Sequence, residues 1–459
     1  YREAKGSGKN AYFDADEFGD LADYYDSLDE LDTAREIISE GLSIHPDSTP
    51  LLVKKAKLAV YDGDYEEALH LLKSSSEYDF DLYLLRIECY LQLEEYQQAY
   101  KLSEELLEKE DQESLDNVFA ELGFLHVEAD CYKEAALYFE ESLRYNPENI
   151  EVLSDLAYSY EMLDDFNAAI TITNKILDIE PYTYEAWINL GKLYSLSEEY
   201  EKAVDSFDFA LTINESDSSV LKLKAHCLSL LGRTKEAIEI FKDLLQTNAI
   251  DTSLYFLLAE CYQSLEMYDE ALNYLQKYQV LEGETEELLT KEAYLYMQKG
   301  DYRRALSISE NGSQLYPSSS EFNIIAGEVA FKQEQYQIAE EYLLSVYPLN
   351  KDNFHLIDLL AMLNIKQENY SEAAYYTEEL LKIDSHNLEA RQRLALLYFE
   401  MDDKEQFNDM LDQFSDKELM SLFQLIYTPE TANYFDRNML ISYLNKARET
   451  RTLFKNLKY

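Results

Sequence analysis

Apolar residues recur along this chain with a helical period. Leu153, Leu156, Ala157 and Tyr160 occupy positions i, i+3, i+4 and i+7, which places them on one face of an α-helix. Comparable stripes follow one another along the chain and are separated by short polar or glycine-containing breaks. The pattern predicts an all-α chain of short amphipathic helices, each of which has to cover its apolar face against a neighbour.

An alanine returns every 34 residues, at Ala169, Ala203, Ala237, Ala271, Ala305, Ala339 and Ala373. Ala34, Ala68, Ala99 and Ala135 extend the series backwards, with one step of 31 residues and one of 36. When this alanine is taken as position 20 of a repeat, twelve repeats begin at residues 15, 49, 80, 116, 150, 184, 218, 252, 286, 320, 354 and 388, and the last of them has Phe407 in place of the alanine. A fixed period of this length indicates a stacked array, which we expect to fill residues 15–414.

Other positions of the repeat are also restricted. Position 8 is glycine or alanine in eleven of the twelve repeats, and only Ile87 differs. Position 17 is tyrosine or phenylalanine in nine repeats, and the break before position 17 contains Gly63, Gly232 or Gly300 in three of the twelve repeats. We therefore expect antiparallel helical hairpins that cross at small residues, with the aromatic residue opening the second helix. Because of Ile87, the shortened step before this repeat and the polar stretch 108–113 after it, we expect a bend or altered packing at the third repeat.

The repeat that begins at Tyr184 resembles the tetratricopeptide repeat (TPR) signature, through Trp187, Leu190, Gly191, Tyr194, Tyr200, Ala203, Phe207 and Ala210. This resemblance implies an α-solenoid, a right-handed superhelix of about twelve TPR hairpins with C-terminal capping helices. In this family positions 2, 5, 9, 12 and 13 of the first helices face an inner, concave wall. The partner-binding candidates on that wall are Phe124, Tyr158, Met162, Ile188, Lys192, Lys222, His226, Phe256, Glu260, Tyr294, Met297, Glu328 and Phe331.

The resemblance favours a non-catalytic scaffold that binds a peptide or protein in the concave groove. Some TPR domains grip a C-terminal carboxylate with a lysine at position 5 and an asparagine at position 9, but here Lys222 is followed by His226. A carboxylate clamp is therefore not expected. Two alternatives remain open: an accessory subunit or truncated part of an enzyme complex, and an oligomer that assembles through its oppositely charged ends.

The formal net charge of −51 bears on the choice of partner. Such a charge repels phosphate backbones and anionic lipid, so we expect a neutral or basic protein or peptide partner, with no nucleic acid and no membrane. The same acidic side chains also keep a long helical array in solution without binding anything, and composition does not separate these two interpretations.

The chain carries no recognisable catalytic or metal-binding motif. The six histidines are scattered without an HExxH pattern, and no GxGxxG, GxxxxGK[ST] or GxSxG sequence occurs. Cys89, Cys227 and Cys261 all fall at position 10, which indicates small buried side chains, and no CxxC pair occurs. We expect no enzyme activity, no cofactor and no metal, and a cytoplasmic location.

The two ends of the chain differ in charge. Residues 1–14 are expected to be a lead segment, and whether a targeting segment or a further domain precedes Tyr1 is left open. Residues 14–32 contain nine Asp or Glu and no Lys or Arg. Residues 415–459 are expected to form capping helices, the first with a Ser415–Glu418 capping box and an end at Pro429, and the second from about Thr431 to Leu457. The second is basic from Arg437 onward.

Overall fold

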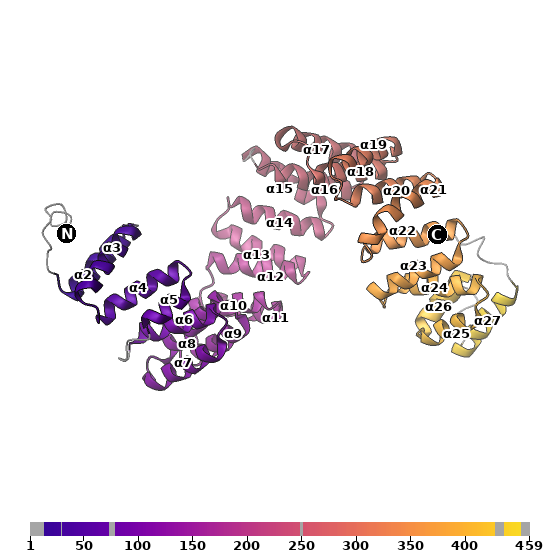
Figure 1. The fold of residues 1–459 in the computed structure, drawn as a ribbon. Helices are drawn as coiled ribbons and strands as arrows, with labels where there is room; N and C mark the ends of the chain where they lie inside the picture. Colours follow the sequence, from indigo (N-terminus) through magenta and orange to yellow (C-terminus); the bar gives the residue numbers. More distant parts are fainter. Residues whose placement is uncertain (1–12, 29, 73–78, 248–250, 427–435, 451–459) are drawn as a thin grey trace. The chain divides into compact units, whose positions relative to one another are not determined.

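The computed structural model describes residues 13–28, 30–72, 79–247, 251–426 and 436–450. Every regular element within these ranges is helical, and helices alternate with short turns (Figure 1). By its internal contacts the chain divides into two compact units, Tyr1–Ile240 and Phe241–Tyr459. The prediction of an all-α repeat chain is confirmed.

The N-terminal unit holds the helices of the first repeats. They are α2 (Ala15–Asp26), α3 (Leu31–Ile44), α4 (Thr49–Tyr61), α5 (Tyr65–Leu72), α6 (Phe80–Gln92), α7 (Tyr96–Lys109), α8 (Leu115–Glu128), α9 (Tyr132–Tyr145), α10 (Ile150–Met162), α11 (Phe166–Ile179), α12 (Tyr184–Leu196), α13 (Tyr200–Ile213) and α14 (Ser218–Leu230). The next helix, α15 (Thr234–Thr247), contains the boundary between the two units.

The C-terminal unit continues in the same way. Its helices are α16 (Ser253–Ser264), α17 (Tyr268–Glu282), α18 (Glu286–Lys299), α19 (Tyr302–Leu315), α20 (Glu321–Lys332), α21 (Tyr336–Val346), the 3₁₀ helix η1 (Tyr347–Leu349), α22 (Phe354–Lys366), α23 (Tyr370–Ile383), α24 (Leu388–Glu400), α25 (Lys404–Gln413), α26 (Asp416–Ile426) and α27 (Arg437–Thr450).

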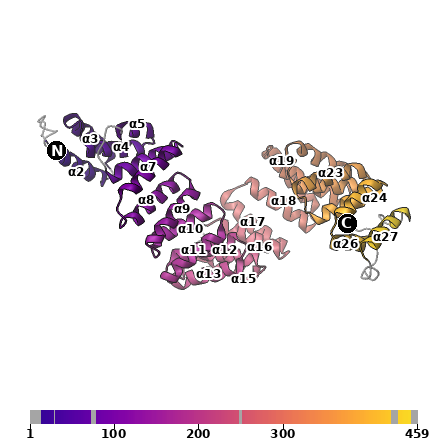
Figure 2. The ribbon, with the colours of Figure 1, turned by 90° about the horizontal axis from the view of Figure 1, so that it is seen from below.

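Consecutive helices pack as hairpins, for example α8 on α9, α12 on α13 and α22 on α23 (Figures 1 and 2). The first helix of every predicted repeat begins within one residue of the start that the alanine period predicts. Each alanine at position 20 exposes 2% of its surface or less. The 34-residue period in the sequence is therefore the period of the hairpins.

Aromatic residues at position 17 open the second helices, as predicted. The ring supplies an apolar anchor where the chain turns back, although α3, α15 and α25 begin at the same position of the repeat with Leu31, Thr234 and Lys404. The first residues of the corresponding helices are Tyr65, Tyr96, Tyr132, Phe166, Tyr200, Tyr268, Tyr302, Tyr336 and Tyr370.

The turn between the two helices depends on one residue with a left-handed backbone, at position 15. Gly63, Gly232 and Gly300 have φ angles of 76°, 76° and 85° there. Among the described residues, eight other repeats hold an acidic residue at the same position, with φ between 56° and 62°. A side chain in this conformation costs about 1–2 kcal/mol relative to glycine, because Cβ approaches the following carbonyl oxygen. The acidic residues are Glu94, Asp130, Asp164, Glu198, Glu266, Glu334, Glu368 and Asp402.

The helix crossing is filled by two residues of complementary size, at positions 8 and 24. A Cβ added at Gly191 would lie 2.5 Å from Cε1 of Phe207, so the ring occupies the space that glycine leaves. In the third repeat the sizes are reversed, because position 8 is Ile87, which is fully buried, and position 24 is the buried Ser103. The hydroxyl of Ser103 donates to the carbonyl of Ala99, so this small polar group is satisfied.

The third repeat also differs in how the next hairpin stacks on it. Helix α8 packs more extensively against α6 than against α7, whereas α10 packs mainly against α9 rather than α8. The prediction of altered packing beside Ile87 is confirmed within the described residues.

The last two helices cover the final repeat. Ser415 and Glu418 form the predicted capping box, since the Ser415 amide donates to the Glu418 carboxylate at 2.6 Å, and helix α26 begins at the next residue. Leu422 and Leu444, from α26 and α27, join one buried cluster with Phe407 of α25. Pro429 and the predicted helical residues 431–435 and 451–457 lie outside the described residues.

Candidate functional site

A groove of about 510 Å³ lies in the C-terminal unit, and only the first helices of successive repeats line it. Helices α16, α18, α20 and α22 contribute these residues (Figure 1). Its apolar part consists of Phe256, Tyr294, Ile324 and Ile325. The two isoleucines are buried, whereas the Tyr294 side chain is 37% exposed. The groove therefore combines a fixed apolar base with an accessible aromatic ring.

The rest of the groove is predominantly acidic. Five glutamates line it, together with one lysine and one histidine as the cationic or protonatable groups. Lys291 is occupied within the chain, because its Nζ lies 2.9 Å from the Glu260 carboxylate and 5.7 Å from the centre of the Phe256 ring. The lining glutamates are Glu260, Glu286, Glu287, Glu321 and Glu328.

Glu328 is the most buried of these glutamates and has two cationic partners. His355 Nε2 donates to one carboxylate oxygen at 3.1 Å, and Lys332 Nζ lies 3.3 Å from the other. Burial raises the pKa of Glu328, but the hydrogen bond from His355 and the two positive charges more than offset it, so the net pKa is lowered. The same hydrogen bond raises the pKa of His355 above its ordinary value of 6.5, against the opposing effect of burial.

This pair gives a prediction for the titration of His355. In the Glu328→Gln variant the histidine loses its carboxylate acceptor, so its pKa should fall toward 6.5, as measured by NMR of the ring protons. Because the pKa of His355 is raised and that of Glu328 is lowered in the folded chain, the stabilisation by this pair is present between about pH 4.5 and pH 6.5. It is lost as the pH rises through the raised pKa of His355 and as the pH falls through the lowered pKa of Glu328. A Glu266→Gln variant, at a turn, is the matched control. An unaltered His355 titration in Glu328→Gln would refute this assignment.

The structure brings four of the predicted candidates together in the groove: Phe256, Glu260, Tyr294 and Glu328. Two others in this unit lie elsewhere. Met297 exposes only 2% of its surface and packs with buried residues of α18 and α20, so it is not available to a partner. Phe331 packs beside Tyr336, with ring centres 5.9 Å apart.

The sequence pattern places Met297, at position 12 of its repeat, on the inner wall. The structure corrects this assignment. Position 12 follows position 8 by four residues, so the two lie only about 40° apart around the helix. Met297 therefore follows Ala293, at position 8, into the core of the hairpin.

The seven candidates in the N-terminal unit do not share a described pocket with one another. Tyr158 and Met162 are 42% and 46% exposed. Lys192 and His226 are exposed, whereas Phe124, Ile188 and Lys222 are partly buried. Phe124 packs edge-on against Phe139, with ring centres 5.3 Å apart, and this contact belongs to the core. These residues remain candidates on the first helices α8, α10, α12 and α14.

Several residues of the groove were not among the candidates. Position 2 of the repeat is occupied by Glu287, Glu321 and His355. The family pattern assigns this position to the inner wall, so these three residues could have been predicted from the sequence. Lys291 and Ile325 occupy position 6, which the pattern omits. Because position 6 is four residues after position 2, the two share one face of the helix.

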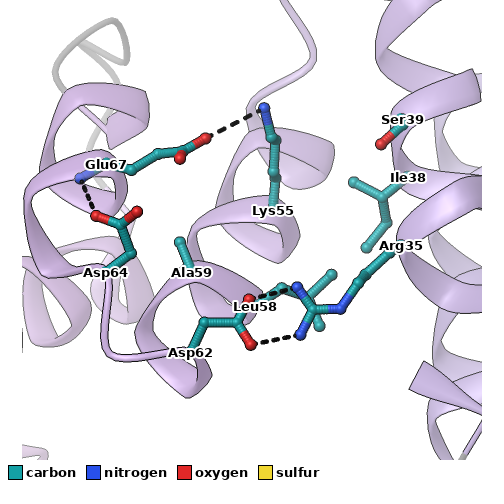
Figure 3. A pocket seen from close by; sticks show the side chains of 9 residues that line it. All are labelled: Arg35, Ile38, Ser39, Lys55, Leu58, Ala59, Asp62, Asp64 and Glu67. Atoms are coloured by element: carbon teal, nitrogen blue, oxygen red, sulfur yellow. Dashed lines mark hydrogen bonds and ion pairs between the residues drawn. The ribbon is translucent and has the colours of Figure 1, made fainter. Parts of the chain in front are cut away.

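A second hollow, of about 240 Å³, lies between α3, α4 and α5 (Figure 3). Its charged groups are paired with one another. Arg35 donates two hydrogen bonds to Asp62, at 2.5 and 2.7 Å, and Lys55 lies 3.6 Å from Glu67. The hydrogen bonds from Arg35 lower the pKa of Asp62. Asp64 accepts from the amide of Glu67 at the start of α5. These contacts hold the hairpins together and leave little charge for a ligand.

A third hollow, of about 590 Å³, is lined by residues of α2, α3 and α4 and by the start of α6. Its two lysines are also occupied, because Lys54 pairs with Asp23 and Lys57 lies 3.3 Å from Asp81. Asp79 accepts from the amide of Leu82 and caps α6. These five charged side chains therefore serve the repeat structure.

The cysteines at position 10 are buried, as predicted. Burial raises the pKa of the Cys89 thiol to about 12, so this group stays protonated near neutral pH. Among the described residues, no three His, Cys, Asp or Glu side chains are arranged to hold a metal ion. Within the same part of the chain, none of the helices has the length and hydropathy needed to cross a lipid bilayer.

Three family models match parts of this chain. The tetratricopeptide repeat model matches residues 290–353, which include most of the groove. The model for anaphase-promoting complex, cyclosome, subunit 3 matches residues 197–278, and the coatomer epsilon subunit model matches residues 21–207.

Curated relatives match over short stretches. A human protein, protein O-mannosyl-transferase TMTC1, is 28% identical over 104 residues, which are 23% of this chain and 12% of the relative. U-box domain-containing protein 70 of Oryza sativa subsp. japonica is 25% identical over 199 residues, which are 42% of this chain and 24% of the relative. The chain thus spans less than a third of the length of either relative.

Solved structures with similar helical arrangements cover more of the chain. The Cut9 and Hcn1 hetero-tetramer of the APC/C shows 15% identity, covers 84% of this chain and 97% of the other, and has a TM-score of 0.38. A tetratricopeptide repeat protein from Parabacteroides merdae shows 19% identity, covers 61% of this chain and 97% of the other, and has a TM-score of 0.40.

Proposed function

The chain is a tetratricopeptide repeat protein, and from this premise we propose that it is a non-catalytic scaffold that binds a peptide or protein partner. The groove in the C-terminal unit carries the proposal, because it is lined by first helices alone and leaves about 510 Å³ open beside an exposed aromatic ring. A concave site with an apolar base and a few placed polar groups suits an extended peptide.

We extend the proposal to the domain organisation of the chain. Residues 15–414 form the binding array, residues 415–459 its cap and residues 1–14 a lead segment. The candidate residues on α8, α10, α12 and α14 provide further contacts for the partner in the N-terminal unit. The activities of the transferase and the U-box protein belong to those proteins, since each match spans a small part of the relative.

Assembly through oppositely charged ends is the weaker alternative. Arg437, the first residue of the basic segment, is bound within its own chain. Its guanidinium lies 2.9 Å from the Asp416 carboxylate and donates to the carbonyl oxygens of Leu411, Asp412 and Phe414. This cation is therefore used to fix α27 in place.

Site-specific photo-crosslinking tests the proposal. A photoreactive phenylalanine replaces Tyr294 in the groove and, as a matched control, Tyr375, a tyrosine of similar exposure on the second helix α23. We expect a partner to be labelled from position 294 and not from position 375. The labelled partner is then purified, and the Tyr294→Ala variant should bind it more weakly by calorimetry. Equal labelling from both positions, or an unchanged affinity, would count against binding in the groove.

A further inference from the structure

The charges of the groove are not balanced within the chain. Glu260 pairs with Lys291, and Glu328 pairs with His355 and Lys332. Glu286, Glu287 and Glu321 are exposed, and no cation of the described residues forms an ion pair with their side chains. Three carboxylates therefore face the groove without an ion-pair partner among the described residues, although the charge of Glu321 helps to raise the pKa of His355. Their combined field attracts a positive group.

These three carboxylates come from two different helices. Glu286 and Glu287 lie in the first turn of α18, and Glu321 lies in the first turn of α20. An acidic residue is well tolerated in a first turn, because the helix dipole favours negative charge there. The helix dipole does not explain why the first turns of α18 and α20 border the same groove. This convergence concentrates negative charge around the apolar base.

The base of the groove already accommodates a cation. The ammonium group of Lys291 lies over the face of Phe256, where it is attracted both by the ring and by Glu260. The neighbouring Tyr294 ring is accessible and has no such cation over it among the described residues. Lysine and arginine lay their aliphatic stems on apolar surfaces and keep their charged ends near carboxylates or water. Such a side chain matches both parts of this groove.

We propose that the groove binds an extended peptide segment in which an arginine or lysine is followed or preceded by an apolar residue. The apolar residue and the aliphatic stem contact Tyr294 and Ile324, and the cationic end pairs with Glu286, Glu287 and Glu321. This inference rests on the proposed function of the groove and adds the chemistry of its occupant. A peptide with an acidic side chain at the same place is repelled by the three carboxylates.

Synthetic peptides test this inference with the full chain. The probes are twelve-residue peptides whose central residue is arginine, lysine, citrulline or glutamate, flanked either by leucine or by serine, with affinity measured by fluorescence anisotropy. Citrulline keeps the shape of arginine and removes its charge. We expect the arginine–leucine peptide to bind about tenfold more tightly than its citrulline counterpart, as three exposed ion pairs allow. This preference should shrink as salt screens the charges.

The variant Glu286→Gln/Glu287→Gln/Glu321→Gln should lose that preference. A matched control, Glu266→Gln/Glu334→Gln/Glu368→Gln, removes the same charge from three turns of the same unit and should retain it. Circular dichroism checks that both variants fold. Equal loss in the two variants would overturn the inference, because net charge and not the groove would then be responsible.

The Tyr294→Ala variant separates this inference from the proposed function. If Tyr294→Ala weakens peptide binding but citrulline and arginine bind equally, the groove binds peptides and the cationic preference is wrong. If Tyr294→Ala leaves the binding of every probe unchanged, peptide binding in the groove is itself refuted, and the inference with it. The proposed function and the cationic preference are both supported only if Tyr294→Ala and the groove triple variant each weaken binding of the arginine–leucine peptide.

Discussion

Replacing Phe207 with alanine is expected to lower the free energy of opening of the α12–α13 hairpin by about 3–5 kcal/mol. Phe207 is fully buried, and its ring fills the space that Gly191 leaves at the helix crossing. Removal of the ring leaves a cavity lined by glycine, which has no side chain to move into it. Native-state hydrogen exchange of the α12 and α13 amides measures the loss locally, which suits an array whose repeats contact only their neighbours.

Phe209 provides the control on the same helix. Its side chain is 53% exposed and stacks on Trp187, with ring centres 4.5 Å apart. Phe209→Ala should therefore lose the stacking contact, worth about 0.5–1.5 kcal/mol, and part of the apolar burial. Losses of equal size at the two positions would show that the crossing is not where the hairpin is most tightly packed.

Placing a larger side chain at the helix crossing is expected to have the second largest effect on stability. Ala203 is fully buried at position 20, and leucine adds three carbon atoms where the two helices meet. Well-packed interiors accept such an addition only by shifting side chains or backbone, so Ala203→Leu should destabilise by about 1–3 kcal/mol. The midpoint of urea unfolding, followed by circular dichroism, measures the change.

Ala168→Leu is the matched control for this prediction. Ala168 is a partly exposed alanine in the first turn of α11, where a larger side chain can extend toward solvent. Its urea midpoint should stay close to that of the unmodified chain. A midpoint for Ala203→Leu that matches the control would mean that position 20 is not the point of closest helix approach.

Much of the fold could be predicted from the sequence, because the restricted residues are those that the hairpin geometry requires. Ala203 and Gly191 mark the crossing because any larger side chain would collide there, and Tyr200 marks the start of α13 because the ring anchors the returning chain. Such requirements recur in every repeat, so periodicity alone exposes them. The left-handed turns were predicted only where glycine occupies them, since Glu334 in that conformation has no distinctive sequence signal.

The groove was harder to predict than the fold. The family pattern identified Phe256 and Tyr294 but also included Met297, which the helix period turns into the core. The pattern gives the direction of a side chain and says nothing of its partners. That Glu328 lies within ion-pair distance of His355, while Glu321 forms no ion pair among the described residues, depends on distances between different repeats. These distances are set only when the hairpins are stacked.

The acidic residues at the left-handed turns have a consequence for the behaviour of the chain in solution. Glycine would relieve about 1–2 kcal/mol of backbone strain at each turn, although its greater freedom in the unfolded chain would cancel about half of that gain. Eight turns give up the remaining gain and present a carboxylate instead. Each of these carboxylates is exposed at the turn between the two helices of its hairpin, where it adds negative charge to the surface. Like charges on colliding molecules repel each other, so these turns give up some conformational stability and oppose aggregation.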